Sequence, residues 1–220
     1  MKIPELIHHN TNGAGKIYFC SDLHYNHFNS IRHGNRPFET TEEMNKKIIE
    51  FFDTTLKSKD ILFDLGDLFW NMSWKSCLEV LDHIPCKFYK IIGNHDSFKL
   101  WYKGQGCKKL KERCEVISDI LDIRVESEGR ETMVTLSHFP IISWNHKGWG
   151  GVHIHGHCHG SLDEVNENGK DLRVDIGWDA KLSREYGSPL IPWNIVEDWF
   201  KSKASGYDYI KYIRSNKILL

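Results

Sequence analysis

Four histidines occupy every second position between residues 152 and 160 of this 220-residue chain: His153, His155, His157 and His159. Imidazole nitrogens are common metal ligands and common general acids and bases. Alternate side chains of a β-strand share one face, so the stretch either lines a face with imidazole or leaves the strand conformation partway along. Metal binding or acid–base catalysis is therefore the chemistry that this stretch indicates.

Ligand-type side chains also follow four other apolar stretches, each predicted to be a strand. The five predicted strand ends are followed by Ser21-Asp22-Leu23-His24, Gly66-Asp67, Gly93-Asn94-His95-Asp96, Ser137-His138 and Gly156-His157-Cys158-His159. Ligand sites of α/β sheets lie at the carboxyl ends of strands, and glycine permits a tight turn there. Each motif is weak alone, but the five together predict one shared site.

The elements that must position these motifs alternate between strands and helices. Helices are expected over 40–57, with Thr40 and Glu43 as a capping box, over 73–84, and over 194–203 with Asn194 as the N-cap. Strands are expected over 16–20, 61–67, 88–92, 152–155 and 170–177, and a hairpin over 120–137. We expect one mixed α/β domain over 1–220, with the motifs in 16–160 and a C-terminal strand and helices in 170–220.

Composition restricts the class of protein. The net charge is −1, which gives no reason to expect a nucleic-acid or membrane partner. No apolar run approaches the roughly 18 residues that span a bilayer, and residues 1–10 lack the apolar stretch of a signal peptide. The six cysteines form no C-x-x-C pair, so we expect reduced thiols and a cytoplasmic location.

The five motifs, in this order over residues 16–160, resemble those of the calcineurin-like metallophosphoesterase superfamily. Further blocks resemble its small single-domain bacterial and phage members: Asp22-Leu23-His24-Tyr25-Asn26-His27, Arg36-Pro37-Phe38, Ser137-His138-Phe139-Pro140 with Trp144, and Val174-Asp175-Ile176-Gly177. The resemblance implies a four-layer αββα sandwich with two mixed β-sheets flanked by helices. It also implies hydrolysis of a phosphate ester by in-line attack of a hydroxide that bridges two metals.

The resemblance also implies a ligand set. One metal would take Asp22, His24, Asp67 and His159, and the other would take Asp67, Asn94, His138 and His157, with Asp67 as the bridge. Oxygen and imidazole ligands without thiolate suit Mn, Fe, Zn, Ni or Mg, and we expect two divalent or trivalent ions, with Mn as the first choice. His157 and His159 are then the ligands among the four histidines. His155 is expected to support the site or to be a satisfied core histidine, His153 to be structural, and Cys158 to point away.

Two residues beside the ligands are candidates for catalysis. His95 is expected to face the substrate, where it would stabilise the transition state or protonate the leaving oxygen. Asp96 would hold the ring of His95, and the alternative for Asp96 is a loop cap.

Four residues are candidates for substrate binding. Asn94 would help stabilise the charge on the phosphoryl oxygens. The guanidinium of Arg36 would donate two hydrogen bonds to a phosphate, and the alternative for Arg36 is a surface salt bridge. His27 would line the entrance to the metal site. Trp144 would offer an aromatic face for a flat group, with core packing as its alternative.

The sequence is compatible with three functions. A phosphodiesterase acting on a small phosphate ester or nucleotide is the leading hypothesis, and a phosphomonoesterase or phosphoprotein phosphatase is the second. A catalytically inactive scaffold of the same fold is the third, disfavoured because every expected ligand is present. No specific nucleic-acid partner is expected, since the basic run 108–113 is typical of a solvated helix face. The sequence does not define the oligomeric state.

Overall fold

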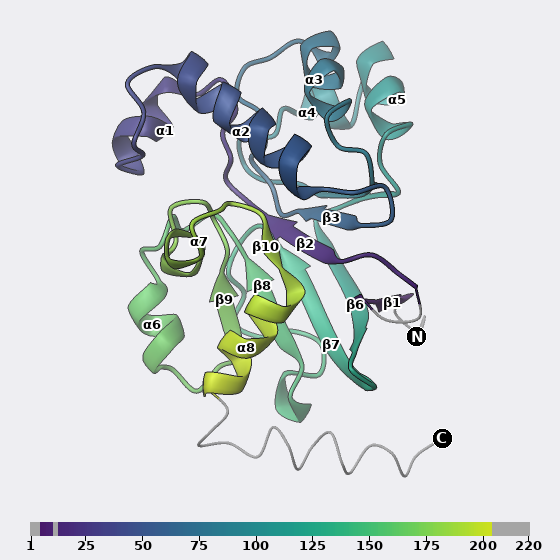
Figure 1. Ribbon diagram of the computed structural model, residues 1–220, viewed down its shortest axis with the longest axis vertical. Coiled ribbons are helices and arrows are strands. Elements are labelled where there is room, and N and C mark those ends of the chain that lie inside the picture. The colour runs from purple at the N-terminus through teal and green to yellow at the C-terminus, as the bar shows by residue number, and fades with distance from the viewer. Residues whose placement is uncertain (1–4, 11–12, 204–220) are drawn as a thin grey trace.

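Two five-stranded mixed β-sheets flanked by helices make up the structure, a computed structural model that describes residues 5–10 and 13–203 (Figure 1). The β2 sheet has the order β10 (Ile191–Pro192), β2 (Ile17–Cys20), β3 (Ile61–Asp64), β4 (Lys87–Ile91) and β5 (Val116–Ser118). The β7 sheet has the order β1 (Glu5–His8), β6 (Ile120–Ser127), β7 (Arg130–Ser137), β8 (Val152–His155) and β9 (Arg173–Asp175). The expected two-sheet α/β architecture is confirmed.

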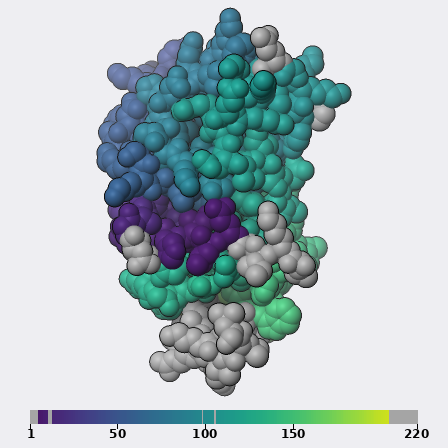
Figure 2. Space-filling model, turned by 90° about the vertical axis from the view of Figure 1, so that its right-hand side faces the viewer, coloured from purple at the N-terminus to yellow at the C-terminus, as the bar shows by residue number. Residues whose placement is uncertain are grey.

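Helices cover the two sheets from different sides. In Figure 1, α1 to α5 lie beyond the β2 sheet, whereas α6, α7 and α8 lie beside β8, β9 and β10. The bounds are α1 Phe28–His33, α2 Thr41–Thr55, α3 Trp74–Leu81, α4 Phe98–Trp101, α5 Gln105–Lys111, α6 Asp163–Asn168, α7 Lys181–Tyr186 and α8 Trp193–Lys203, with a short 3₁₀ helix η1 at Lys147–Trp149. The N-terminal residues form a purple band in Figure 2, between the blue and teal helical half and the green part of the chain.

The alternation of side chains along β2 explains its two packing partners. Ile17 and Phe19 join the apolar cluster shared with the β7 sheet and α8, whereas Tyr18 and Cys20 join the cluster under α2 and α3. A strand presents successive side chains to opposite faces, so a short and wholly buried strand can fill both clusters.

Local signals placed most elements correctly. The capping box of Thr40 and Glu43 starts α2 as expected, and the predicted hairpin forms from β6 and β7. The prediction that Asn194 caps the last helix is wrong: α8 begins at Trp193, so Asn194 lies in its first turn. The strand expected over 170–177 is the shorter β9. The moderately apolar pattern of the tail from residue 205 predicts packing on the core or on a partner, and this tail lies outside the described residues.

The two sheets meet at the edge where their parallel strands end. β2, β3 and β4 run parallel in one sheet, and β7, β8 and β9 in the other. A parallel bridge joins Ser21 to Gly177 across the two sheets. Gly156 is packed so closely that a Cβ there would overlap Ser21 and Asp22. All five predicted ligand motifs therefore emerge at one place.

Candidate metal centre

Backbone strain marks the residues at this edge. Five of the seven predicted ligands have left-handed backbone angles: Asp22 (φ 57°), His24 (51°), Asp67 (57°), His157 (69°) and His159 (47°). Such conformations cost non-glycine residues about 1–3 kcal/mol each and concentrate at functional sites. The fold holds these side chains in place at the expense of local stability.

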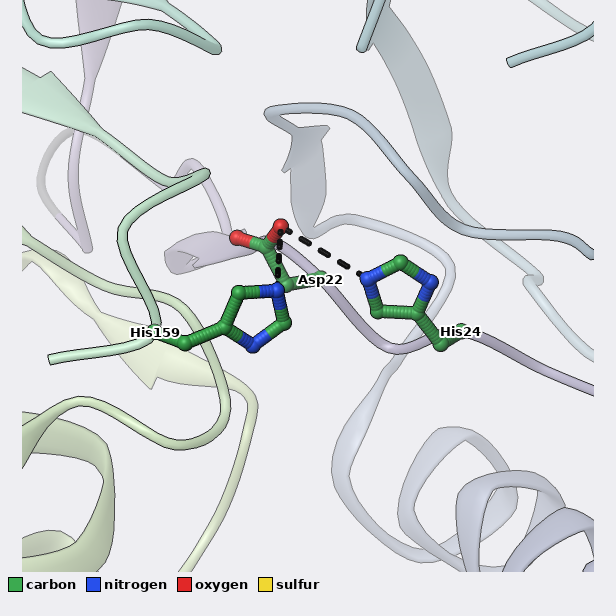
Figure 3. A group of neighbouring side chains, drawn as sticks. All are labelled: Asp22, His24 and His159. Atoms are coloured by element: carbon green, nitrogen blue, oxygen red, sulfur yellow. Dashed lines mark ion pairs between the residues drawn. The ribbon is translucent and has the colours of Figure 1, made fainter. Parts of the chain in front are cut away.

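A first group of predicted ligands consists of Asp22, His24 and His159 (Figure 3). The Nε2 atoms of His24 and His159 lie 3.9 and 3.7 Å from Oδ1 of Asp22. This buried oxygen has no hydrogen-bond partner within the described part of the chain. A buried carboxylate oxygen without a donor is costly, and a cation between these three atoms would satisfy it.

A second group consists of Asp67, Asn94, His138 and His157. The Nε2 atom of His138 lies 3.3 Å from Oδ2 of Asp67 and 2.9 Å from Oδ1 of Asn94. The Nδ1 atom of His157 lies 2.8 Å from the same Asn94 oxygen. Ligand atoms of Asp22, Asp67 and His138 also lie within 4.8 Å of one another, so the two groups adjoin. All seven predicted ligands are thus brought together.

Hydrogen bonds behind the site fix two of the imidazole rings. His138 donates from Nδ1 to the carbonyl oxygen of Leu65 (2.9 Å), and His159 donates from Nδ1 to Oδ2 of Asp179 (2.7 Å). Each bond holds the ring so that its Nε2 atom faces the site, the orientation that ligating histidines require. The sequence interpretation missed Asp179. Its only signal was a carboxylate two residues after the Val174–Gly177 block.

The protonation states of His24 and Asp67 suit cation binding. Burial lowers the pKa of His24 to about 3, so its imidazole is neutral near pH 7. Burial alone would raise the pKa of Asp67, but the hydrogen bond and charge of His138 bring it below its usual range. Burial raises the pKa of Asp22, although the nearby charges of His138 and His159 oppose this shift. A bound cation would favour the ionised form of this carboxylate.

The loop after β4 places His95 beside the first group but gives Asp96 a different role. The ring of His95 lies 5.5 Å from that of His24, and its backbone N–H donates to Oδ1 of Asp67 (2.8 Å). Oδ2 of Asp96 accepts from the backbone N–H groups of Gly93 (2.8 Å) and Asp67 (3.0 Å). The prediction that Asp96 holds the ring of His95 is therefore corrected in favour of the loop-cap alternative.

His27 lies at the mouth of the first group. Its ring stacks on Trp70 with centroids 3.7 Å apart, and its Nδ1 atom lies 3.3 Å from Nδ1 of His24. Trp70 also meets His95 edge-on at 4.9 Å. The sequence interpretation did not single out Trp70, whose contact with both histidines depends on the loop after β3.

The structure contradicts two predicted substrate contacts. Arg36 is buried, and its guanidinium makes a two-point ion pair with Asp179. Trp144 is also buried, where its indole donates to the carbonyl oxygen of Gly151 (2.8 Å) and its ring packs 5.3 Å from that of His153. Arg36 turns inward toward a partner 143 positions away in the sequence, whereas Trp144 turns inward onto Gly151 and His153 in the segment that follows it.

The two earlier histidines of the opening stretch are core residues. His153 donates from Nδ1 to the carbonyl of Thr135 (3.0 Å) and accepts from the N–H of Ile141 (3.3 Å). His155 donates to the carbonyl oxygen of Gly156 (2.8 Å) and lies 3.3 Å from the amide nitrogen of Asn166. Burial lowers their pKa values to about 3 and about 4, so both rings are neutral.

Cys158 lies in a further group with His155 and Asp175. Burial raises the pKa of Cys158 to about 11, which keeps the thiol protonated near pH 7. The carboxylate of Asp175 accepts from the backbone N–H groups of Gly177 (2.8 Å) and Gly160 (3.0 Å). These contacts hold the loop that carries His157 and His159.

The fold has two mixed sheets, and carboxylate, amide and imidazole side chains adjoin at the ends of its strands. This combination is typical of metal-dependent hydrolases. The chain belongs to the calcineurin-like phosphoesterase family, which it matches over residues 15–217.

Two similar proteins accompany this assignment. An uncharacterized protein of Methanocaldococcus jannaschii, MJ1445, is 36% identical over 168 residues, which cover 73% of this chain and 81% of that protein. The fold resembles the crystal structure of AQ665, a protein of unknown function from Aquifex aeolicus, with a TM-score of 0.59 and 21% identity over 83% of this chain and 98% of the other. Within the described residues, no helix is long and apolar enough to cross a membrane.

Proposed function

We propose that this chain is a dinuclear metal-dependent phosphoesterase that hydrolyses small phosphate esters or nucleotides, and diesters in preference to monoesters. The observation that carries the proposal is that seven ligand-type side chains lie in two adjoining groups, in which the buried Oδ1 of Asp22 has no partner within the described residues. Family membership supports phosphoester hydrolysis. The diester preference rests on the tendency of this family alone. A reducing cytoplasm remains the proposed location.

The proposed ligands divide between two cations. Asp22, His24 and His159 would hold the first cation, Asn94, His138 and His157 would hold the second, and Asp67 would be shared between them. Manganese is the first choice, with iron, zinc, nickel or magnesium also compatible with these ligands. When bound, the two cations would withdraw charge from the phosphoryl oxygens and make nearby water a better nucleophile.

His95 is the proposed proton donor to the leaving oxygen. Its side chain is exposed, whereas its backbone N–H is tied to Oδ1 of Asp67. The ring lies beside those of His24 and Trp70, and within the described residues its nitrogens are left to meet substrate. A positioned acid of this kind contributes about 10²–10⁴-fold to the rate.

His27 and Asn94 are the proposed substrate contacts that remain. The Nδ1 atom of His27 is directed at His24, so Nε2 is the nitrogen left for a phosphoryl oxygen. Oδ1 of Asn94 faces His138 and His157, which leaves its Nδ2 group as a donor toward substrate.

Metal analysis combined with a substrate screen tests the proposal. After loading with manganese, we expect about two ions per chain and faster hydrolysis of bis(4-nitrophenyl) phosphate than of 4-nitrophenyl phosphate, with cyclic nucleotides as further diesters. Asp67→Ala should lose metal and activity together. The control Asp198→Ala, at an exposed carboxylate of α8, should keep both. A stoichiometry near zero under saturating manganese would refute the proposal, whereas faster monoester turnover would remove only the diester preference.

A further inference from the structure

A buried ion pair lies directly behind the first group of ligands. Nε and Nη2 of Arg36 lie 2.8 Å from Oδ1 and 2.8 Å from Oδ2 of Asp179. Each side chain keeps only 2% of its surface exposed. Two charges buried to this degree destabilise a fold unless hydrogen bonds satisfy their remaining donors and acceptors. The other contacts of this pair therefore show which segments it holds.

The other donors of Arg36 bind the segment that carries two ligands. Nη2 donates to the carbonyl oxygen of Asp22 (2.7 Å), and Nη1 donates to the carbonyl oxygen of Leu23 (2.8 Å). The guanidinium also lies over the ring of Trp178, 4.4 Å from its centroid. Arg36 therefore binds the backbone of the strained turn between Asp22 and His24.

Asp179, the acidic partner of Arg36, contacts His159, the third residue of the first group. Oδ2 of Asp179 accepts both from Arg36 and from Nδ1 of His159, the latter at 2.7 Å. The hydrogen bond to Asp179 raises the pKa of His159. Gly34 lies so close that a Cβ there would overlap the Asp179 carboxylate, which leaves this carboxylate little room to reorient.

We propose that Arg36 and Asp179 are positioning residues that control the affinity of the first cation site and leave the second site unaffected. The pair joins the backbone of Asp22 to the imidazole of His159, so it sets the separation between ligands that belong to different sheets. This inference rests on the proposed function, because it requires these residues to bind a cation.

The geometry explains why arginine occupies this position. The planar guanidinium offers several donors in a fixed fork, and four of its contacts are directed at once to the two Asp179 oxygens and two carbonyl oxygens. A lysine ammonium would keep the charge but could not span these acceptors. Loss of a partner that orients a ligating histidine costs about 10–100-fold in metal affinity.

Manganese titration of the metal-free full-length protein tests this inference without an activity assay. Arg36→Lys and Asp179→Asn should each weaken one class of site by about 10–100-fold and leave the other class unchanged. Arg32→Lys, at an exposed arginine of α1, and Asp198→Asn, in α8, are the matched controls and should change neither class. Asp179→Asn is nearly isosteric, so it serves as the test if Arg36→Lys fails to fold.

Paired variants identify which site responds. In a His157→Ala background, Asp179→Asn should weaken the remaining site by the same factor as in the wild type. In a His159→Ala background it should have little further effect, because the imidazole that it orients is gone. An equal loss in both backgrounds, or no change in either class, would overturn the inference. A wild-type protein that binds no manganese would instead refute the proposed function, so the two failures are distinguishable.

Discussion

Nζ of Lys90 lies 2.7 Å from Oδ2 of Asp96, and both side chains are completely buried. Lys90 also contacts Asp64 at 2.6 Å. The same Asp96 oxygen accepts from the backbone N–H groups of Gly93 and Asp67. A buried cation on β4 thus anchors the loop of Asn94 and His95 together with the proposed bridging ligand.

Lys90→Met should strongly destabilise the fold. Burial alone would lower the pKa of Lys90, but the charges of Asp64 and Asp96 raise it above its usual range. The lysine is therefore charged, and its removal leaves two buried carboxylates uncompensated. We expect a loss of about 3–5 kcal/mol in the free energy of unfolding, measured by urea denaturation. Lys87→Met, at an exposed position of the same strand, is the control and should change stability by less than about 0.5 kcal/mol. An equal effect of the two substitutions would contradict this role.

His95→Ala should separate catalysis from metal binding. The backbone N–H of residue 95, which donates to Asp67, is retained in alanine, so both cation sites should persist. Turnover should fall by about 10²–10⁴-fold, with metal content measured on the same preparation. Release of one cation by this variant would show that His95 is a ligand and not a proton donor.

Gly156→Ala should damage the metal centre. A Cβ at this position would overlap Oγ of Ser21 and Oδ2 of Asp22, so the segment before His157 must shift. We expect a stability loss of about 1–3 kcal/mol and weaker manganese binding in a titration. Gly148→Ala is the matched control, because a Cβ there meets nothing within 4 Å. Unchanged manganese affinity in Gly156→Ala would show that the close approach of these loops is not needed.

His153→Gln should reduce the sensitivity of the fold to acid. Burial lowers the pKa of His153 to about 3, whereas an unfolded histidine titrates near 6.5. Between these values the unfolded chain binds the extra proton. His153 thus costs no stability above about pH 6.5 and lowers stability by up to about 1.4 kcal/mol per pH unit as pH falls toward 3. Urea denaturation from pH 7 to 4 should show a shallower decline in the variant than in the wild type. His33→Gln, at an exposed position, is the control and should leave the decline in stability with falling pH unchanged. Identical slopes for His153→Gln and the wild type would show that His153 is not a buried neutral histidine.

The sequence by itself determined the main strands and helices that position the site and the candidate ligands. Apolar stretches of four to seven residues predicted β2, β3, β4 and β8, and the Thr40 capping box predicted the start of α2. These signals are local, since strand periodicity and helix capping depend on near neighbours along the chain. Because parallel strands end at one edge, the polar residues after them could be assigned to a single site before any contact was known.

Only the tertiary structure decided which partners these side chains meet. Arg36 pairs with Asp179, 143 positions away in the sequence, and so turns inward from the expected substrate. Asp96 meets Lys90 and the N–H of Asp67 instead of the neighbouring His95 ring. The direction of a charged side chain is set by which opposite charges and donors the packing of distant segments buries beside it, because an unpaired buried charge is too costly to persist.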